Sequence, residues 1–183
     1  MDIPISTAEP WHIWLKHPEL AKHVDFITVH LLPYWEGTIR REAIDEILQH
    51  ITKLQKTFPG KKIVVGEVGW PSNGDRFRHA DPSVENEAQF LRRFFAVAQR
   101  EKIDYYVMEA FDQPWKEIGE GRVGAYWGMF DADRELKFPL AGSVQEDAHW
   151  IAKALVAIVL TLLPMWWFCR RFSNFYLQGL VFM

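Results

Sequence analysis

The sequence predicts an α/β fold with a parallel β-sheet, followed by one transmembrane helix. Two observations lead to this prediction. Short β-rich or apolar runs alternate with segments of helical period over residues 3–110, which is the pattern of βαβ units. A long apolar segment near the end of the chain approaches the length needed to cross a bilayer.

The composition limits the class of protein. The chain has 183 residues, a length typical of about one domain, with 21 basic and 24 acidic residues and a net charge of -3. Nucleic-acid binding is excluded as a main role, because it rests on concentrated Lys and Arg. The single cysteine, Cys169, excludes an internal disulfide and a cysteine-based zinc site. Aromatic residues reach 15%, with nine Trp, a surplus that fits a large core, a membrane interface or a sugar-binding cleft.

Strands and helices are predicted in alternation along the chain. A helix follows from the apolar 3–4 spacing between Ile39 and Leu54, and Pro59-Gly60 ends it. Asp81 and Pro82 are expected as the N-cap and first residue of a second helix. Strands are expected at residues 3–7, 24–31, 62–67 and 104–110. The third is a continuous apolar run, as in strands buried on both faces of a parallel sheet.

An ionisable side chain stands near the end of each predicted strand. These residues are Glu9, His30, Glu67 and Glu109. Parallel barrels build their active sites at the carboxyl ends of the strands, so we expect the four side chains to gather there. Two carboxylates flanking a glycosidic bond are the usual apparatus for its hydrolysis. The pattern therefore indicates a carbohydrate-cleaving site, with hydrogen bonding at the sheet rim as the alternative for Glu9 and His30.

Aromatic residues follow the same strand ends. Because the C–H faces of sugar rings pack on aromatic rings, the set is predicted to line a sugar cleft. Packing in the core is the alternative for each ring taken singly. The rings belong to Tyr34, Trp35, Trp70, Trp115, Tyr126 and Trp127.

Five segments resemble motifs of one enzyme family. Residues 64–72, Val-Val-Gly-Glu-Val-Gly-Trp-Pro-Ser, resemble the nucleophile signature of glycoside hydrolase family 17, the β-1,3-glucanase-like enzymes. Residues 30–35, 109–116 and 126–130 resemble the motifs after strands 6 and 8 and in the closing loop, and residues 6–11 resemble the end of strand 5 in bacterial members. The resemblance covers about residues 3–140 and implies the C-terminal half, strands 5–8, of a (β/α)8 TIM barrel.

The resemblance also implies roles for single residues. Glu67 is the expected nucleophile of a retaining reaction on β-glucan. The family's acid, a Glu in an Asn-Glu motif after strand 4, is expected upstream of Met1, so no acid is assigned. Gln113 replaces the Glu of many relatives and keeps hydrogen bonding without the charge. Lys116 is expected to steer a sugar hydroxyl or keep the carboxylates ionised. The expected substrate-binding residues are Glu9, His30, Tyr34, Trp35, Trp70, Glu109, Gln113, Trp115, Lys116 and Tyr126.

The acid role stays open for Glu109. Neighbouring strands lie about 4.8 Å apart, and the carboxyl groups of a retaining pair lie about 5–5.5 Å apart. A Glu67–Glu109 pair is therefore compatible with the predicted sheet. The family arrangement assigns the acid elsewhere and favours a supporting role for Glu109.

The predicted transmembrane helix covers residues 151–171. Its apolar stretch, 154–169, contains no charged residue, and Trp150 and Trp166-Trp167 lie at its ends like the aromatic belts of a bilayer. Arg170-Arg171 are expected in the cytoplasm, which makes the barrel extracytoplasmic. A buried core helix is the alternative, and Pro164 favours it. Residues 141–150 are a predicted linker and residues 172–183 the start of a further hydrophobic segment.

Three functions remain open at this stage. The first is a membrane-anchored retaining β-glucan hydrolase or glucanosyl transferase. The second follows from bacterial relatives, which are often fused to membrane family 2 glycosyltransferases: an extracytoplasmic module of a glucan- or glycolipid-synthesising enzyme. The third is a non-catalytic carbohydrate-binding remnant, since both ends of the chain are expected to be truncated. The expected partners are β-glucan, the inner or plasma membrane and a glycosyltransferase domain, with no metal or nucleotide cofactor.

Overall fold

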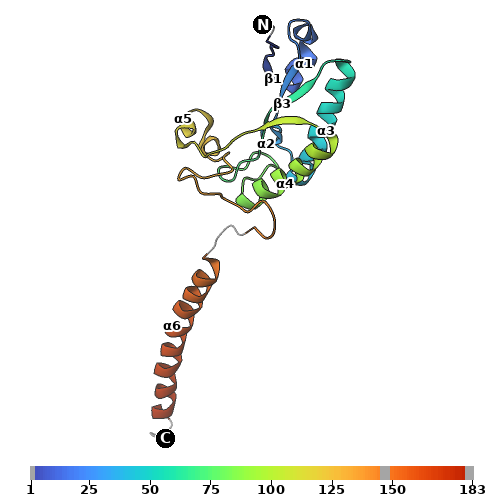
Figure 1. Ribbon diagram of the computed structural model, residues 1–183. Coiled ribbons are helices and arrows are strands. Elements are labelled where there is room, and N and C mark those ends of the chain that lie inside the picture. Colours follow the sequence, from blue (N-terminus) through green and yellow to red (C-terminus); the bar gives the residue numbers. More distant parts are fainter. Residues whose placement is uncertain (1–2, 145–148, 180–183) are drawn as a thin grey trace. The chain divides into compact units, whose positions relative to one another are not determined.

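The computed structural model describes residues 3–144 and 149–179 of the chain (Figure 1). Two compact units are present, residues 1–146 and residues 147–183. The first unit holds the sheet and its helices. The second unit is a single helix and is described separately below.

The first unit is built on a four-stranded parallel sheet. Its strands are β1 (Ala8–Pro10), β2 (Ile27–Leu31), β3 (Ile63–Val68) and β4 (Asp104–Val107), paired in the order β1-β2-β3-β4. The register places His30 opposite Glu67, and Val68 opposite Val107. All four carboxyl ends therefore meet at one edge, and the predicted α/β class with a parallel sheet is confirmed.

Helices connect successive strands. Between β1 and β2 lie α1 (Trp11–Lys16) and the 3-10 turn Pro18–Lys22. Between β2 and β3 lie α2 (Pro33–Glu36) and α3 (Arg40–Thr57), and α4 (Val84–Glu101) lies between β3 and β4. α3 and α4 pack side by side (Figure 1). Their apolar stripes meet the buried faces of β2 and β3, because residues spaced three and four apart share one helix face. The core includes Ile44, Ile47, Phe90, Leu91, Phe94, Ile27, Val29 and Val65.

A folded-back segment follows β4. It contains the 3-10 turn Pro114–Lys116, α5 (Glu117–Glu120) and the 3-10 turn Arg122–Ala125. Backbone hydrogen bonds then join residues 109–113 to residues 125–130, including Glu109 N to Trp127 O at 2.8 Å and Asp112 N to Phe130 O at 2.9 Å. This pairing fixes the chain that leaves β4 close to the carboxyl edge of the sheet.

Two predicted boundaries of the first strands are wrong. The first strand begins at Ala8, not at Ile3, and the second begins at Ile27, not at Val24. The side chain of Asp25 accepts a hydrogen bond from Ile5 N at 2.8 Å, and Asp25 N donates to Ile5 O at 2.9 Å. These two hydrogen bonds occupy the backbone groups of Ile5 and the amide of Asp25, which a longer β1–β2 ladder would have used. The fourth strand likewise ends at Val107, before the predicted Ala110.

The predicted start of the second helix is also wrong. Ser83 is the N-cap of α4, and its hydroxyl accepts a hydrogen bond from Asn86 N at 3.0 Å. Asp81 lies outside the helix, where its carbonyl accepts from Trp70 Nε1 at 3.1 Å and from Asn86 Nδ2 at 2.9 Å. The Asp81 carbonyl therefore links the loop that carries Trp70 to the first turn of α4, which carries Asn86.

The second unit consists of α6 (Trp150–Gly179). Residues 150–171 form a 22-residue segment of mean hydropathy 1.9, long and apolar enough to cross a membrane, with none of its side chains buried within the structure. Arg170 lies over the Trp166 ring at 4.6 Å, and Arg171 over the Trp167 ring at 5.4 Å. The helix runs on through the position where a further hydrophobic segment was expected to start.

Candidate active site

Glu67 and His30 meet at the carboxyl edge of the sheet. Each is the second-last residue of its strand, and their Cα atoms are register partners. His30 Nδ1 lies 3.3 Å from Glu67 Oε2, although the alignment is not that of a hydrogen bond. The Glu67 side chain is 41% exposed, so a substrate can reach its carboxylate. The imidazole flanks that carboxylate and restricts where it can turn.

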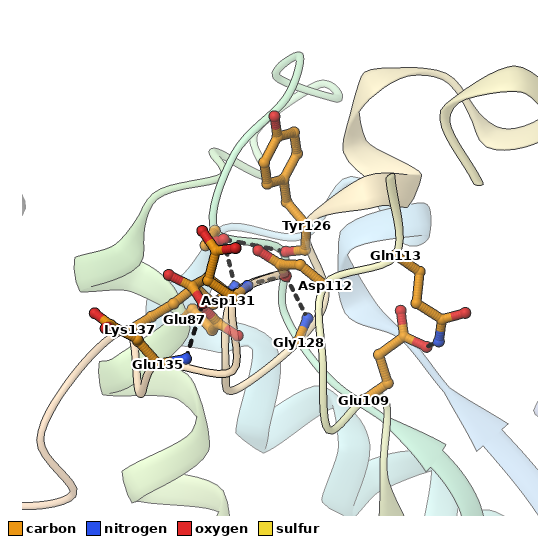
Figure 2. Close-up of polar contacts among 11 residues, drawn as sticks. Glu87, Glu109, Asp112, Gln113, Tyr126, Gly128, Asp131, Glu135 and Lys137 are labelled. Carbon is orange, nitrogen blue, oxygen red and sulfur yellow. Dashed lines mark hydrogen bonds and ion pairs between the residues drawn. The ribbon is translucent and has the colours of Figure 1, made fainter. Parts of the chain in front are cut away.

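Glu109 forms the second polar group, two residues beyond β4. Its Oε2 accepts a hydrogen bond from Lys116 Nζ at 2.7 Å and another from Gln113 Nε2, which Figure 2 shows. The Lys116–Glu109 pair is largely shielded from water, with side chains 15% and 14% exposed. Glu109 Oε1 has no hydrogen-bond partner among the described residues. One oxygen is therefore fixed by two donors, and the other is buried without a hydrogen-bond partner from the described part of the chain.

Glycine at position 69 lets these two groups approach each other. A Cβ atom there would lie 2.0 Å from the carbonyl oxygen of Met108, a distance that no side chain tolerates. The chain leaving β3 thus passes directly against the residue that precedes Glu109. This close approach brings the Glu67 strand end beside the Glu109 strand end.

The aromatic residues divide into exposed and buried rings. Trp115 is 68% exposed and Trp35 is 41% exposed, so both have ring surface available for a sugar. Trp35 stacks on the fully buried Trp127, with ring centroids 6.1 Å apart and an interplanar angle of 26°. The Lys116 ammonium lies over the Trp115 ring, 5.8 Å from the ring centroid.

Three rings expected in the cleft belong to the core instead: Trp70 and Trp127 are 0% exposed, and Tyr34 is 2% exposed. The Trp70 indole donates to Asp81 O, and the Tyr34 hydroxyl donates to Asp75 O at 2.6 Å. Tyr34 packs against Trp35, Trp70 and Trp127. None of the three buried rings has a free face for a sugar.

Glu9 and Tyr126 occupy the margins of the site. Glu9 lies within β1, not after it, and its register partner is Val29, one position before His30. Tyr126 is half-buried, and its ring points away from the Lys137 ammonium (Figure 2). Its carbonyl accepts a hydrogen bond from Ser72 N at 2.8 Å, which ties the closing segment to the loop after β3.

A buried polar cluster behind the site was not predicted. Lys137 Nζ lies 2.7 Å from Ser72 Oγ, 3.0 Å from Asp112 Oδ1 and 3.1 Å from Glu87 Oε2 (Figure 2). Burial raises the pKa of the Glu87 carboxyl to about 8, against the opposing effect of the Lys137 charge. The sequence held one signal for the cluster: Glu87 falls on the apolar stripe of α4, beside Ala88, Phe90 and Leu91. A carboxylate at such a position requires a buried partner.

Within residues 3–144 and 149–179, no group of three or more His, Cys, Asp or Glu side chains is arranged to hold a metal ion.

Carboxylates at the carboxyl ends of parallel α/β strands, with exposed tryptophan beside them, define a glycoside hydrolase of the barrel type. A family model described as the BtgE/BtgC glycoside hydrolase domain matches residues 1–128. The chain belongs to this family, within the β-1,3-glucanase-like glycoside hydrolases of family 17.

Curated relatives and solved structures support this assignment. The chain is 30% identical over 146 residues to a glucan 1,3-beta-glucosidase of Saccharomyces cerevisiae, covering 74% of this chain and 47% of that protein. A Schizosaccharomyces pombe glucan 1,3-beta-glucosidase is 29% identical over 147 residues, covering 76% and 46%. The chain thus spans about half the length of the curated relatives it matches.

Among solved structures, a family 17 β-1,3-glucanosyltransferase from Rhizomucor miehei matches with a TM-score of 0.67 and 33% identity, covering 74% of this chain and 48% of that one. An active-site mutant of the Rhizomucor enzyme in complex with laminaritriose matches with the same TM-score and 30% identity, covering 80% and 51%.

Proposed function

We propose that the first unit is the C-terminal half of the catalytic barrel of a retaining β-1,3-glucan hydrolase or glucanosyl transferase, with Glu67 as its nucleophile. The observation that carries the proposal is the position of Glu67: exposed, at a parallel strand end, in contact with His30 and beside the Lys116–Glu109 pair. Relatives named for glucan 1,3-beta-glucosidase and β-1,3-glucanosyltransferase activity support the substrate class.

The proposed reaction proceeds in two displacements. Glu67 attacks the anomeric carbon, the bond from that carbon to the leaving oxygen breaks, and a general acid protonates this oxygen. A water molecule, or a sugar hydroxyl in the transferase, then attacks the same carbon. The bond to Glu67 breaks, and the attacking oxygen gives its proton to the group that acted as the acid.

Substrate binding falls to the neighbouring groups. Glu109, whose side chain is 14% exposed, is the proposed contact for a sugar hydroxyl. Lys116 orients the Glu109 carboxylate through their 2.7 Å hydrogen bond. Trp115 and Trp35 stack on sugar rings from the exposed side. Glu9, Gln113 and Tyr126 complete the proposed subsites, whereas Tyr34 and Trp70 act from the core.

The acid is not assigned to a described residue. By the family arrangement it belongs to strand 4, whereas we assign the four described strands to strands 5–8. Glu109 is a poor substitute, because its Oε2 is held by Lys116 and Gln113 and is not free to donate to a leaving oxygen.

The nucleophile is tested with a reagent that needs no acid. A 2-fluoro-β-glucoside with a dinitrophenyl leaving group departs without protonation, and its fluorine slows the second displacement. Incubation of the 183-residue chain in detergent, followed by peptide mass mapping, is expected to place a fluoroglucosyl group on Glu67. Glu67→Gln is expected to abolish the adduct. An adduct on Glu109 would reassign the nucleophile.

Anchoring in a membrane is a second part of the proposal, supported by α6. Residues 150–171 have the length and hydropathy of a span, and Arg170 and Arg171 at one end fit a cytoplasmic boundary. Alkaline phosphatase fused after Phe172 is expected to be inactive, and a fusion before Trp150 active. The reverse pattern would place the sheet in the cytoplasm. An anchored barrel suits both an enzyme at the membrane surface and a module of a glucan-synthesising glycosyltransferase.

A further inference from the structure

The Lys137 ammonium lies where four segments of the first unit converge (Figure 2). Ser72 comes from the loop after β3, Glu87 from α4, and Asp112 from the loop after β4. Lys137 itself follows the hairpin in which Phe130 pairs with Leu136. The Lys137 side chain is only 9% exposed, and those of Glu87 and Asp112 are 0% and 6% exposed. Charged contacts this well shielded from water are stronger than surface pairs.

Two of these contacts reach the loops that carry the proposed site. Ser72 ends the motif that begins around Glu67, and its amide donates to Tyr126 O at 2.8 Å. Asp112 immediately precedes Gln113, whose side chain holds Glu109. Asp112 Oδ1 also accepts from Gly128 N at 2.8 Å. Lys137 therefore donates one hydrogen bond to the loop after β3, through Ser72, and one to the loop after β4, through Asp112.

The charges of Lys137, Asp112 and Glu87 are consistent with a contact that holds the two loops together. At neutral pH the buried Glu87 is largely neutral, since its pKa is raised to about 8. The Lys137 ammonium is then balanced by one carboxylate, that of Asp112, to which it donates, and it donates a second hydrogen bond to Ser72 Oγ. Glu87 Oε2 lies 3.1 Å away without a hydrogen bond, so the ammonium meets three oxygen atoms.

We propose that Lys137 is a positioning residue for the glycosidase site: it ties the loop after β3 to the loop after β4 and thereby sets the relative positions of Glu67 and Glu109. The catalytic consequence rests on the proposed function, whereas the tie between the loops does not. The sequence neighbourhood of Lys137 gives no sign of this role, because its partners lie 25 to 65 residues away.

Hydrogen exchange of the 183-residue chain in detergent tests the tie itself. The amides of Ser72, Glu109, Asp112 and Gln113 all have backbone acceptors, so their protection is measurable by mass spectrometry. Lys137→Met is expected to speed exchange about tenfold or more in peptides covering residues 69–74 and 109–113, but not in α3. Ser72→Ala removes the hydroxyl that accepts from Lys137 and donates to Tyr126 O but leaves the Lys137–Asp112 contact, so it is expected to speed exchange in residues 69–74 and not in residues 109–113.

Lys61→Met is the matched control. Lys61 Nζ donates to Val24 O at 2.5 Å at the opposite, amino-terminal end of β3. Its replacement removes a comparable lysine contact, and the exchange of both loops is expected to stay unchanged. Unaltered loops in Lys137→Met, or equally faster exchange in α3, would overturn the proposal.

The positional consequence is tested with the fluoroglucoside reagent. If Lys137 positions Glu67, Lys137→Met lowers the labelling rate at saturating reagent about tenfold, while the half-saturating concentration changes less than threefold. Equal rates in Lys137→Met and wild type would refute the positioning role. If the wild type is not labelled at all, the proposed function fails, and the exchange experiment still decides whether Lys137 ties the loops.

Discussion

The tryptophans show how the surroundings of a single residue decide its role. Trp70 and Trp115 both follow strands and both were expected in a sugar cleft, yet one is fully buried and the other is 68% exposed. Flat apolar rings serve a core and a cleft equally well. Only the position of α4 and its Phe90, which packs against Trp70, separates the two cases.

This difference predicts opposite effects of the same substitution. Trp115→Ala is expected to weaken laminaritriose binding severalfold without changing thermal stability, because the ring contacts little protein. Trp70→Ala is expected to destabilise the first unit by about 3–5 kcal/mol, the usual cost of removing a buried aromatic side chain. Titration calorimetry and chemical denaturation measure the two effects. A large stability loss in Trp115→Ala would show that its ring packs against the protein.

The Glu87 carboxyl is expected to make stability depend on pH. Its pKa is raised from 4.5 to about 8 by burial, so between these pH values the folded protein keeps a proton that the unfolded chain releases. Stability then falls as pH rises through this window, by about 1.4 kcal/mol per pKa unit at most, and levels off above pH 8. The difference in unfolding free energy between wild type and Glu87→Gln isolates this contribution. A difference independent of pH from 4.5 to 8 would contradict it.

At the scale of elements, periodicity was the most informative signal. The spacing of apolar residues located α3 and α4, because a helix must bury a stripe of period 3.6. The first and last residues of the elements are harder to predict. Asp81-Pro82 and Ser83 are both reasonable starts for α4. The choice between them depends on the side chains of Trp70 and Asn86, which donate hydrogen bonds to the Asp81 carbonyl. The Lys137 cluster escaped prediction for the same reason, since it assembles from four distant segments.

The observed cap of α4 gives a direct comparison. Ser83→Ala is expected to cost about 1 kcal/mol of stability, because Asn86 N loses its acceptor. Asp81→Ala, at the cap position suggested by the sequence, is expected to cost clearly less, since the bonds at this residue use its carbonyl. Urea denaturation of both variants decides between the two caps. A larger loss for Asp81→Ala would favour the earlier helix start.

At the scale of the whole molecule, the parallel sheet and the family motifs were predictable, because each motif is contiguous and carries its own strand end. The order β1-β2-β3-β4 follows from the connections alone, since short βα units place successive strands side by side. Among the described residues, β1 and β4 each pair with one neighbour. The described sheet therefore supplies one flank of the site, the one that carries Glu67 and Glu109.

The 183-residue chain is therefore expected to be inert toward laminarin. Retaining hydrolysis of an ordinary glucoside needs an acid to protonate the leaving oxygen, and this assistance contributes about 10²- to 10⁴-fold. If the sheet is half of a barrel, as proposed, Glu67 in this chain also lacks the substrate alignment that the other flank would contribute. The dinitrophenyl fluoroglucoside serves as the control, because it needs no acid: labelling of Glu67 without release of reducing sugar from laminarin would separate a missing acid from a misfolded site. Deleting residues 150–183 is expected to leave this inactivity unchanged, since the defect lies in the sheet unit. Rapid cleavage of laminarin by the chain would instead assign the acid to Glu109 or Glu9. Loss of this cleavage in Glu109→Gln, with the dinitrophenyl reaction spared, would select Glu109, and the same result in Glu9→Gln would select Glu9.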